Sequence, residues 1–293
     1  MPKRMQGKVS FITGAGRGQG RAHAVRQAAE GANIIAIDIC EDIPSNFYPM
    51  ASWDDLMETK RLVEAEGQRC VARKADVRDR EQLRAALAAG VEELGQLTTV
   101  CANAGIMPMA VGRPSSPLDF QDAVDVDLGG VMSAVAVAIP YLLPAGNGAS
   151  IIITGSTAGL MPNTVGGSGG APNPGGSGYA FSKHVIVPYT EEMAMHLAPY
   201  GVRVNAIHPT NVSTALLHNE YIYSLFRPDL EVVTREDFEP ASQHFQALPI
   251  PWLEPEDVAD LVLFLASDDS KNITGDNIRI DAGSMIKWPE GPK

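Results

Sequence analysis

Short apolar runs and longer amphipathic segments alternate along the whole chain. A short apolar run bounded by turn residues is typical of a buried strand, and apolar residues every three or four positions are typical of a helix. The predicted strands are 9–13, 33–38, 70–77, 97–105 (which runs into a turn), 150–156, 202–208 and 276–281. The predicted helices are 21–30, 54–66, 79–95, 119–143, 179–200 and 255–267. This alternation predicts an α/β protein with a doubly wound parallel sheet, forming one domain over residues 1–293.

A glycine cluster joins the first strand to the first helix. The segment 13–20 has glycine at positions 14, 16, 18 and 20, directly before an alanine-rich helix. Glycines let the backbone turn tightly and approach a pyrophosphate, whose charge then lies at the helix N-terminus. A plain structural turn is the alternative, but the strand before and the helix after favour phosphate binding in a Rossmann-type fold.

An acidic residue ends the second predicted strand. Asp38 lies 24 residues after Gly14. This is near the offset of about 20 residues at which a carboxylate binds the adenosine ribose of NAD and repels the 2′-phosphate of NADP. Arg17 in the glycine cluster is a basic residue that could contact a phosphate instead. We favour NAD, because a carboxylate at the ribose is hard to reconcile with a phosphate there.

Two further groups of residues follow predicted strands. Ligands of a doubly wound sheet bind outside the carboxyl ends of the strands. Asp76 and Val77 leave the third strand at a position suited to an adenine ring, although a solvated loop explains an aspartate there nearly as well. Asn103, Ala104 and Gly105 follow the fourth strand, so we expect them at the same edge.

Tyr179 and Lys183 are four residues apart, a spacing that places both side chains on one face of a helix. A phenol titrates near pH ~10 and is a poor base at neutral pH, but a nearby ammonium lowers its pKa. The pair therefore predicts general acid–base catalysis. A solvated surface pair is the alternative, and the accompanying motifs favour catalysis.

Three segments interrupt the alternation of strands and helices. Residues 39–53 contain two prolines and three aromatic residues without periodicity, which predicts an insertion beside the adenosine end of the cofactor. Residues 159–178 are rich in Gly, Pro, Asn and Ser and predict a mobile loop over the site. Apolar side chains gather from about 210 to 253. There we favour a segment that covers the substrate over an oligomer contact.

Composition narrows the classes of partner. The net charge of −12 at pH 7 argues against nucleic acid and against an anionic membrane surface. No apolar signal segment follows the basic first residues, and no stretch approaches the ~18 apolar residues of a membrane span. Cys40, Cys70 and Cys101 show no metal-ligand spacing, so we expect reduced structural thiols, no metal and a cytoplasmic protein.

These motifs resemble the short-chain dehydrogenase/reductase family over nearly the whole chain. The resemblance rests on the TGxxxGxG loop that starts at Thr13, on Asn103-Ala-Gly, and on Ser156 with Tyr179 and Lys183. It implies hydride transfer between NAD and a secondary alcohol or its ketone. In this mechanism Tyr179 accepts the hydroxyl proton, Ser156 binds the substrate oxygen, and Lys183 lowers the pKa of the tyrosine.

The motifs and the resemblance together assign the site residues. The expected cofactor-binding residues are Gly14, Arg17, Gly18, Gln19, Gly20, Asp38, Ile39, Asp76, Val77, Asn103, Ala104, Gly105, Tyr179, Lys183, Pro209, Val212 and Thr214. Thr214 matches the family's threonine that holds the nicotinamide carboxamide. The implied catalytic set is Ser156, Tyr179, Lys183 and Asp127.

Within the family, the chain is most similar to the mycofactocin-associated, carveol-dehydrogenase-like branch. The similarity rests on the segment 13–21, the strand end Ile37-Asp38-Ile39-Cys40 and the insertion after it. It implies an apolar terpenoid- or steroid-like alcohol as substrate and NAD that stays bound while an external redox carrier reoxidises it. The family also implies a homotetramer assembled through the helices at 119–143 and 179–200.

The chain departs from the family pattern at two places. Asp127 stands where the family has an asparagine, and its charge would oppose lowering of the Tyr179 pKa. Our hypothesis is that the proton relay works through a backbone carbonyl and water, so that Asp127 is tolerated. Ser156 and Tyr179 are 23 residues apart, farther than is usual in the family. Ser156 ends a predicted strand and Tyr179 begins a predicted helix, so a longer loop between them need not move either residue. We therefore predict an altered substrate entrance with the catalytic set intact.

Two other functions are compatible with these motifs. One is a ketone or 3-oxoacyl reductase with an exchangeable cofactor, disfavoured because the sequence shows no basic patch for an acidic carrier and Asp38 opposes NADP. The other is a dinucleotide-sensing protein without catalysis, because a fold alone does not define a function. The presence of Ser156, Tyr179 and Lys183 together argues against a sensor.

Overall fold

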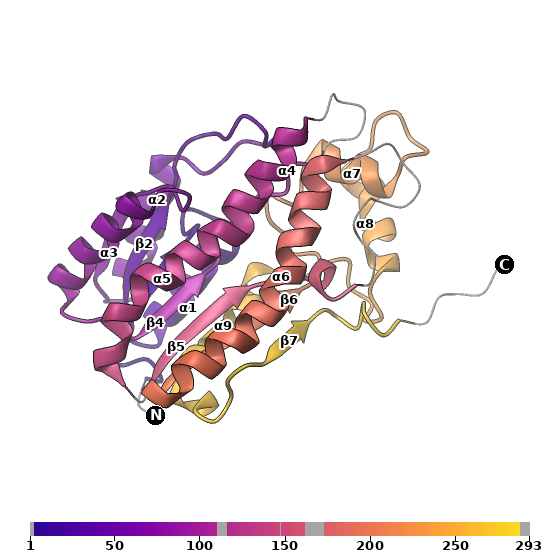
Figure 1. Cartoon of the computed structure of the whole chain (residues 1–293). Coiled ribbons are helices and arrows are strands. Elements are labelled where there is room, and N and C mark those ends of the chain that lie inside the picture. The colour runs from indigo at the N-terminus through magenta and orange to yellow at the C-terminus, as the bar shows by residue number, and fades with distance from the viewer. Residues whose placement is uncertain (1–2, 110–115, 147, 162–172, 288–293) are drawn as a thin grey trace.

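A parallel sheet of seven strands forms the centre of the molecule, in the order β3-β2-β1-β4-β5-β6-β7 (Figure 1). The computed structural model describes residues 3–109, 116–146, 148–161 and 173–287. The strands are β1 (Val9–Thr13), β2 (Asn33–Asp38), β3 (Cys70–Lys74), β4 (Thr99–Ala102), β5 (Ala149–Thr154), β6 (Val202–Pro209) and β7 (Asn277–Ile280). The α-helices are α1 (Gly18–Ala29), α2 (Trp53–Ala65), α3 (Arg80–Leu94), α4 (Pro117–Val124), α5 (Val131–Leu142), α6 (Pro174–Leu197), α7 (Glu220–Phe226), α8 (Arg235–His244) and α9 (Pro255–Ala266). The predicted fold class is confirmed.

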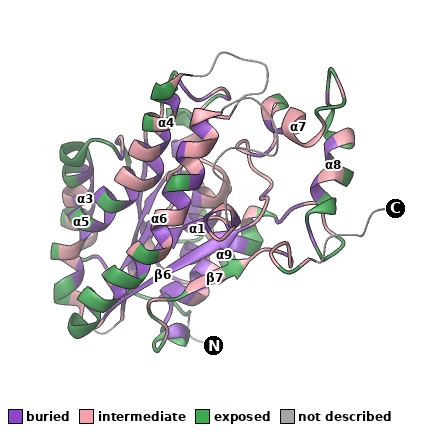
Figure 2. Cartoon of the chain, turned by 45° about the vertical axis from the view of Figure 1, so that its right-hand side comes forward, coloured by how far each residue is buried: buried purple, intermediate pink, exposed green. Residues whose placement is uncertain are grey.

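Helices cover both faces of the sheet, as the continuous burial of its strands requires. All residues of β1 and of β5 are buried. α1 packs against α2 and α9 on one face, whereas α3 packs against α5, and α4 against α6, on the other (Figure 1). Figure 2 shows the buried strands enclosed by helices whose outer sides are exposed. The core therefore consists of two apolar layers, one on each side of the sheet.

The strand order reverses at β1, which pairs with both β2 and β4. The chain segments that follow β1 and β4 cross to opposite faces of the sheet. A crevice therefore opens at the carboxyl ends of these two strands. Thr13 ends β1, and its hydroxyl accepts a hydrogen bond from the backbone N–H of Asn103 at 3.0 Å. The reversal thus brings the glycine cluster and the segment after β4 to one place.

The long helix predicted at 119–143 is not regular. A six-residue π-helix, η1 (Asp125–Gly130), joins α4 to α5. The continuous helical run Pro117–Ala145 has 29 residues and is long and apolar enough to cross a membrane. Because 61% of its most apolar window is buried inside the domain, we interpret it as a core helix.

The helix that carries Tyr179 begins earlier than predicted. α6 starts at Pro174, and the side chain of Asn173 caps it by accepting a hydrogen bond from the Gly176 N–H at 3.0 Å. Asparagine at the N-cap and proline in the first turn both favour a helix start. The predicted loop 159–178 was therefore wrong for residues 174–178, and its residues 162–172 lie outside the described ranges.

Candidate active site

One cleft lies at the carboxyl ends of the central strands. Its volume is about 380 Å³, and every residue that we assigned to catalysis or cofactor binding lines it. These residues come from segments as far apart as Gly14 and Thr214. The fold therefore gathers the whole predicted set at one place.

The glycine cluster gives the cleft a backbone wall. Gly14 and Gly18 have φ angles of +66° and +53°, a region that side chains disfavour. A Cβ on Gly20 would lie 2.0 Å from the carbonyl oxygen of Gly14. Among the described residues, no side chain caps the first turn of α1, and that turn contains no acidic residue. Its N–H groups and the helix dipole therefore suit an anionic pyrophosphate.

Asp38 lies where β2 ends and is 7% exposed. One of its carboxylate oxygens accepts a hydrogen bond from the backbone N–H of Gly16 at 2.9 Å, and burial raises the pKa of the carboxyl group. The Arg17 guanidinium donates a hydrogen bond to the backbone carbonyl of Pro49 and lies 5.9 Å from the centre of the Tyr48 ring. Arg17 is thus engaged by the insertion, and the carboxylate of Asp38 faces the cleft.

Asn103 connects three strands beneath the cleft. Its side-chain N–H donates to the backbone carbonyl of Thr13 at 3.1 Å, and its side-chain oxygen accepts from the hydroxyl of Thr154 at 3.2 Å. The N–H of Ala104 also donates to the Thr13 hydroxyl at 3.0 Å. These bonds fix the ends of β1, β4 and β5 relative to one another.

Ser156, Tyr179 and Lys183 meet at the middle of the cleft. The Lys183 ammonium donates to the backbone carbonyl of Thr154 at 2.9 Å and lies 5.5 Å from the centre of the Tyr179 ring. Burial raises the pKa of Tyr179 to about 12, a hydrogen bond with the Ser156 side chain opposes this, and the charge of Asp127 adds to it. The expected lowering of the Tyr179 pKa is therefore not seen, because desolvation outweighs the hydrogen bond with Ser156.

Asp127 lies in the π-helix and is completely buried. One carboxylate oxygen accepts from the backbone N–H of Ile106 at 3.2 Å and lies 3.7 Å from the Lys183 ammonium. Its other oxygen has no hydrogen-bond partner among the described residues. Burial raises the pKa of Asp127 to about 7, although Lys183 opposes the shift. A Cβ on Gly105 would come within 2.5 Å of the carboxylate, so a larger residue there would displace the Asp127 side chain.

Apolar side chains line one end of the cleft. They come from the segment after β4 and from the segment around α7: Ile106, Met107, Met109, Leu216, Leu217, Ile222, Leu225 and Phe226. Behind them, the buried ring of Phe238 on α8 stacks on Tyr223 with ring centres 4.6 Å apart and on Trp252 at 6.0 Å. The segment around α7 and α8 therefore has a packed aromatic core of its own and closes the apolar end.

The insertion at 39–53 covers the cleft from the side of β2. Ile43, Tyr48 and Met50 line the cleft. The ring of Phe47 lies 5.7 Å from that of Tyr221 on α7. The insertion and the segment around α7 therefore meet across the cleft.

Sequence reasoning missed several of the lining residues. Tyr48 and Met107 were not assigned to the site, although both line the cleft. The signal for Tyr48 was an aromatic residue within an insertion next to a cofactor-binding strand. Within the described ranges, no group of three or more His, Cys, Asp and Glu side chains is arranged to hold a metal ion.

The Rossmann-type sheet, the glycine wall and the Ser156–Tyr179–Lys183 group together define a dinucleotide-dependent oxidoreductase. The chain belongs to the short chain dehydrogenase family, whose pattern matches residues 8–222. It is 43% identical to (−)-trans-carveol dehydrogenase of Rhodococcus erythropolis, over 97% of this chain and 99% of that protein.

Two solved structures have the same fold over nearly the whole chain. Carveol dehydrogenase from Mycobacterium avium in complex with NAD is 43% identical, with a TM-score of 0.89 over 97% of this chain and 100% of that one. A short chain dehydrogenase from Mycobacterium paratuberculosis bound to NAD is 38% identical, with a TM-score of 0.84 and the same coverage.

Proposed function

We propose that this protein transfers a hydride between NAD and an apolar secondary alcohol or its ketone, with a terpenoid- or steroid-like substrate. The observation that carries the proposal is the placement of Ser156, Tyr179 and Lys183 between a phosphate-binding wall and an apolar pocket. The relatedness to carveol dehydrogenases supports the substrate class. Because the pocket end is lined mainly by Ile, Leu, Met and Phe, a neutral apolar molecule fits it better than a charged one.

The residues of this chain provide the acid–base chemistry of that reaction. In alcohol oxidation, Tyr179 accepts the hydroxyl proton and Ser156 binds the substrate oxygen, and in ketone reduction Tyr179 returns the proton. Lys183 holds a positive charge beside the phenol, fixed by its bond to the backbone carbonyl of Thr154. When bound, NAD supplies the hydride acceptor and the positive charge of its nicotinamide ring.

The residues present also fit NAD. The first turn of α1 and the glycines of the cluster suit the pyrophosphate, and Asp38 suits the adenosine ribose. Asp76, Val77, Pro209, Val212 and Thr214 also line the cleft. The first two would hold the adenine end of the cofactor, and the other three the nicotinamide end. The side-chain oxygen of Gln19 is buried beside the glycine wall and has no hydrogen-bond partner among the described residues, so it is a further acceptor for the cofactor.

NAD retention is part of the proposal. The Phe47–Tyr221 contact joins the two segments that cover the cleft, and together they would hinder the release of a bound dinucleotide. A cofactor that stays bound needs an external redox carrier to reoxidise it in place. The proposed partner is therefore an external redox carrier that reaches the bound cofactor.

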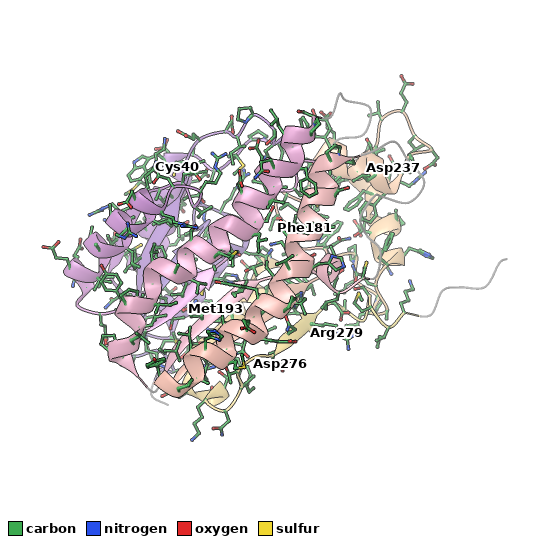
Figure 3. The ribbon with its side chains drawn as sticks, viewed as in Figure 1. Cys40, Phe181, Met193, Asp237, Asp276 and Arg279 are labelled. Atoms are coloured by element: carbon green, nitrogen blue, oxygen red, sulfur yellow. The ribbon has the colours of Figure 1, made fainter. Side chains whose placement is uncertain are left out.

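We also propose a cytoplasmic homotetramer. The helices expected to form its contacts carry exposed apolar side chains, with exposed fractions of 42% for Met132 on α5, 43% for Phe181 on α6 and 63% for Met195 on α6. Figure 3 shows Phe181 on α6. Exposed apolar side chains on adjacent helices suit a contact between subunits.

The nucleotide released by denaturing the purified protein tests the proposal first. We expect stoichiometric NAD after extensive dialysis, and turnover of apolar secondary alcohols with an artificial electron acceptor. Tyr179→Phe is the matched control, which retains NAD and loses turnover. An active protein without bound nucleotide would refute retention alone. A wild-type protein inactive toward all alcohols and ketones, with either added NAD or the acceptor, would refute the function.

A further inference from the structure

A buried histidine lies directly behind the catalytic serine. His208 is the last residue but one of β6 and is completely buried. It is not one of the residues that line the cleft. A Cβ on Gly155 would come within 2.5 Å of its ring, so the imidazole lies directly against the residue that precedes Ser156. His208 thus supports the active site without facing it.

The ring of His208 connects Ser156 to two other elements. Its Nδ1 atom lies 3.2 Å from the backbone nitrogen of Ser156 and 2.9 Å from the Ser156 carbonyl oxygen. Its Nε2 atom lies 2.9 Å from the side-chain oxygen of Asn277 on β7. The side-chain nitrogen of Asn277 donates to the backbone carbonyl of Val187 on α6 at 3.4 Å. The end of β5 is therefore connected to the helix that carries Tyr179.

These partners determine which ring nitrogen of His208 carries the proton. Burial lowers the pKa of His208 and outweighs the contacts with Asn277 and Ser156, which raise it, while the charge of Lys183 on α6 lowers it further. The imidazole is therefore neutral at neutral pH. A neutral imidazole has one donor and one acceptor. Because the Asn277 oxygen can only accept, Nε2 carries the hydrogen, and Nδ1 is an acceptor for the N–H of Ser156 at 3.2 Å. In this tautomer the 2.9 Å separation of Nδ1 from the Ser156 carbonyl oxygen is a close contact between two acceptors and not a hydrogen bond.

We propose that His208 is a positioning residue that holds the peptide of Ser156 and thereby aims its hydroxyl at the substrate oxygen. The inference rests on the proposed function, since Ser156 binds a substrate only in an active enzyme. Ser156 lies just beyond β5, whose pairing with β6 continues through the bond from the Gly155 N–H to the Ile207 carbonyl at 2.8 Å. The next N–H, that of Ser156, lies beyond this last ladder bond and has the Nδ1 atom of His208 at 3.2 Å.

Removing this acceptor leaves the Ser156 N–H without its partner and frees the peptide to rotate. The rotation displaces the hydroxyl, which otherwise accepts a hydrogen bond from the Ala158 N–H at 3.1 Å. A displacement of about 1 Å at a reacting group costs roughly a hundredfold in rate. Because the apolar pocket supplies most of the substrate affinity, kcat falls while KM changes little.

Three variants test the inference in steady-state assays of the holoenzyme. His208→Leu removes the acceptor, and we expect kcat to fall by about ten- to a hundredfold with KM and NAD content unchanged. His208→Asn places a side-chain oxygen near the position of Nδ1 and restores most of kcat. Asn205→Ala is the matched control. The side chain of this buried neighbour on β6 donates to the Ile273 carbonyl at 3.0 Å, so the variant loses thermal stability while kcat stays at the wild-type level.

The inference is overturned if folded His208→Leu has the kcat of the wild type, or if His208→Asn loses as much as His208→Leu. Should His208→Leu not fold, Asn277→Ala takes its place, since it removes the acceptor for Nε2–H outside the active site. A smaller fall in kcat supports the inference, and an unchanged kcat overturns it. If the wild type turns over no alcohol, the proposed function fails. Crystal structures of wild type and variant then decide the inference, because a displaced Ser156 hydroxyl supports it and an unmoved one overturns it.

Discussion

The carboxylate of Asp127 lies 3.7 Å from the ammonium of Lys183, and their side chains are 0% and 4% exposed. Burial disfavours the charge on each of them and therefore raises the pKa of Asp127, to about 7, and lowers that of Lys183. Their mutual attraction opposes both shifts. A pKa of about 7 means that the carboxyl group of Asp127 changes its protonation near neutral pH.

Asp127→Asn should alter how stability depends on pH. The folded pKa of Asp127, about 7, is above the value of 3.8 for a free carboxyl group, so the folded state binds more protons between these two values. The free energy of unfolding therefore falls as the pH rises through this window, by at most about 1.4 kcal/mol per unit from this group. Urea denaturation at pH 5 and pH 7 should show a smaller decrease for the variant. Equal decreases would contradict the shift.

The same substitution tests the hypothesis that the proton relay tolerates a carboxylate. If a backbone carbonyl and water carry the relay, Asp127→Asn leaves kcat for alcohol oxidation at pH 7 close to that of the wild type. Steady-state kinetics at saturating alcohol measure this, with Tyr179→Phe as the inactive reference. A large rise in kcat would show that the carboxylate charge limits Tyr179.

The contact between the insertion and α7 should slow the release of NAD. An aromatic pair contributes about 0.5–1.5 kcal/mol, so Phe47→Ala should speed NAD dissociation by roughly two- to tenfold. Tyr221→Ala should have the same effect, and the double variant should add little to it. Trp53→Ala is the control, because this exposed aromatic residue ends the same insertion. Stopped-flow displacement of NAD measures the dissociation rate. Unchanged rates in the variants would show that the Phe47–Tyr221 contact does not slow NAD release.

The aromatic core around α8 should hold the apolar pocket closed. Phe238 is 0% exposed and stacks on both Tyr223 and Trp252. Phe238→Ala should cost about 3–5 kcal/mol in the packing of this segment and raise KM for the alcohol with NAD content unchanged. Phe245→Ala, which truncates a ring that is 52% exposed, should cost far less. An unchanged KM in Phe238→Ala would show that the segment does not form the substrate pocket.

Charges on α6 should disrupt the proposed tetramer. Glutamate at Phe181 or Met195 would place a carboxylate in an apolar contact between subunits, where it cannot be solvated. We expect Phe181→Glu and Met195→Glu to form smaller species in light scattering after size-exclusion chromatography. Val232→Glu, at a position that is 79% exposed near α8, should keep the wild-type mass. A wild-type mass for all three would place the interface elsewhere.

The sheet and the glycine wall could be predicted because the sequence patterns that indicate them are local. A buried parallel strand is a short apolar run, and the turn after β1 needs glycine at particular positions, so the segment 9–20 alone indicates both. Tyr179 and Lys183 could be paired for the same reason, since four residues on a helix determine their shared face. These predictions needed no knowledge of contacts between distant segments.

Other features depend on contacts that no local pattern reveals. The start of α6 at Pro174 was hidden because asparagine, proline and glycine also occur in loops. The Phe47–Tyr221 contact joins residues 174 positions apart, and neither carries a periodic signal. His208 resembles any other polar residue in a strand until its ring is placed against Ser156. The pKa of Tyr179 was misjudged because desolvation depends on the burial of the whole site.

The π-helix between α4 and α5 is less stable than a regular α-helix, but it orients the side chain of Asp127 toward Lys183. Such a segment contains an extra residue relative to a regular α-helix and is less stable than one. Deleting one residue from Asp125–Gly130 would give a regular and more stable helix, but would rotate the two flanking helices by about 100° relative to each other. Asp127 would then turn away from Lys183. Selection for thermal stability alone would thus remove the irregularity that brings this carboxylate into the active site.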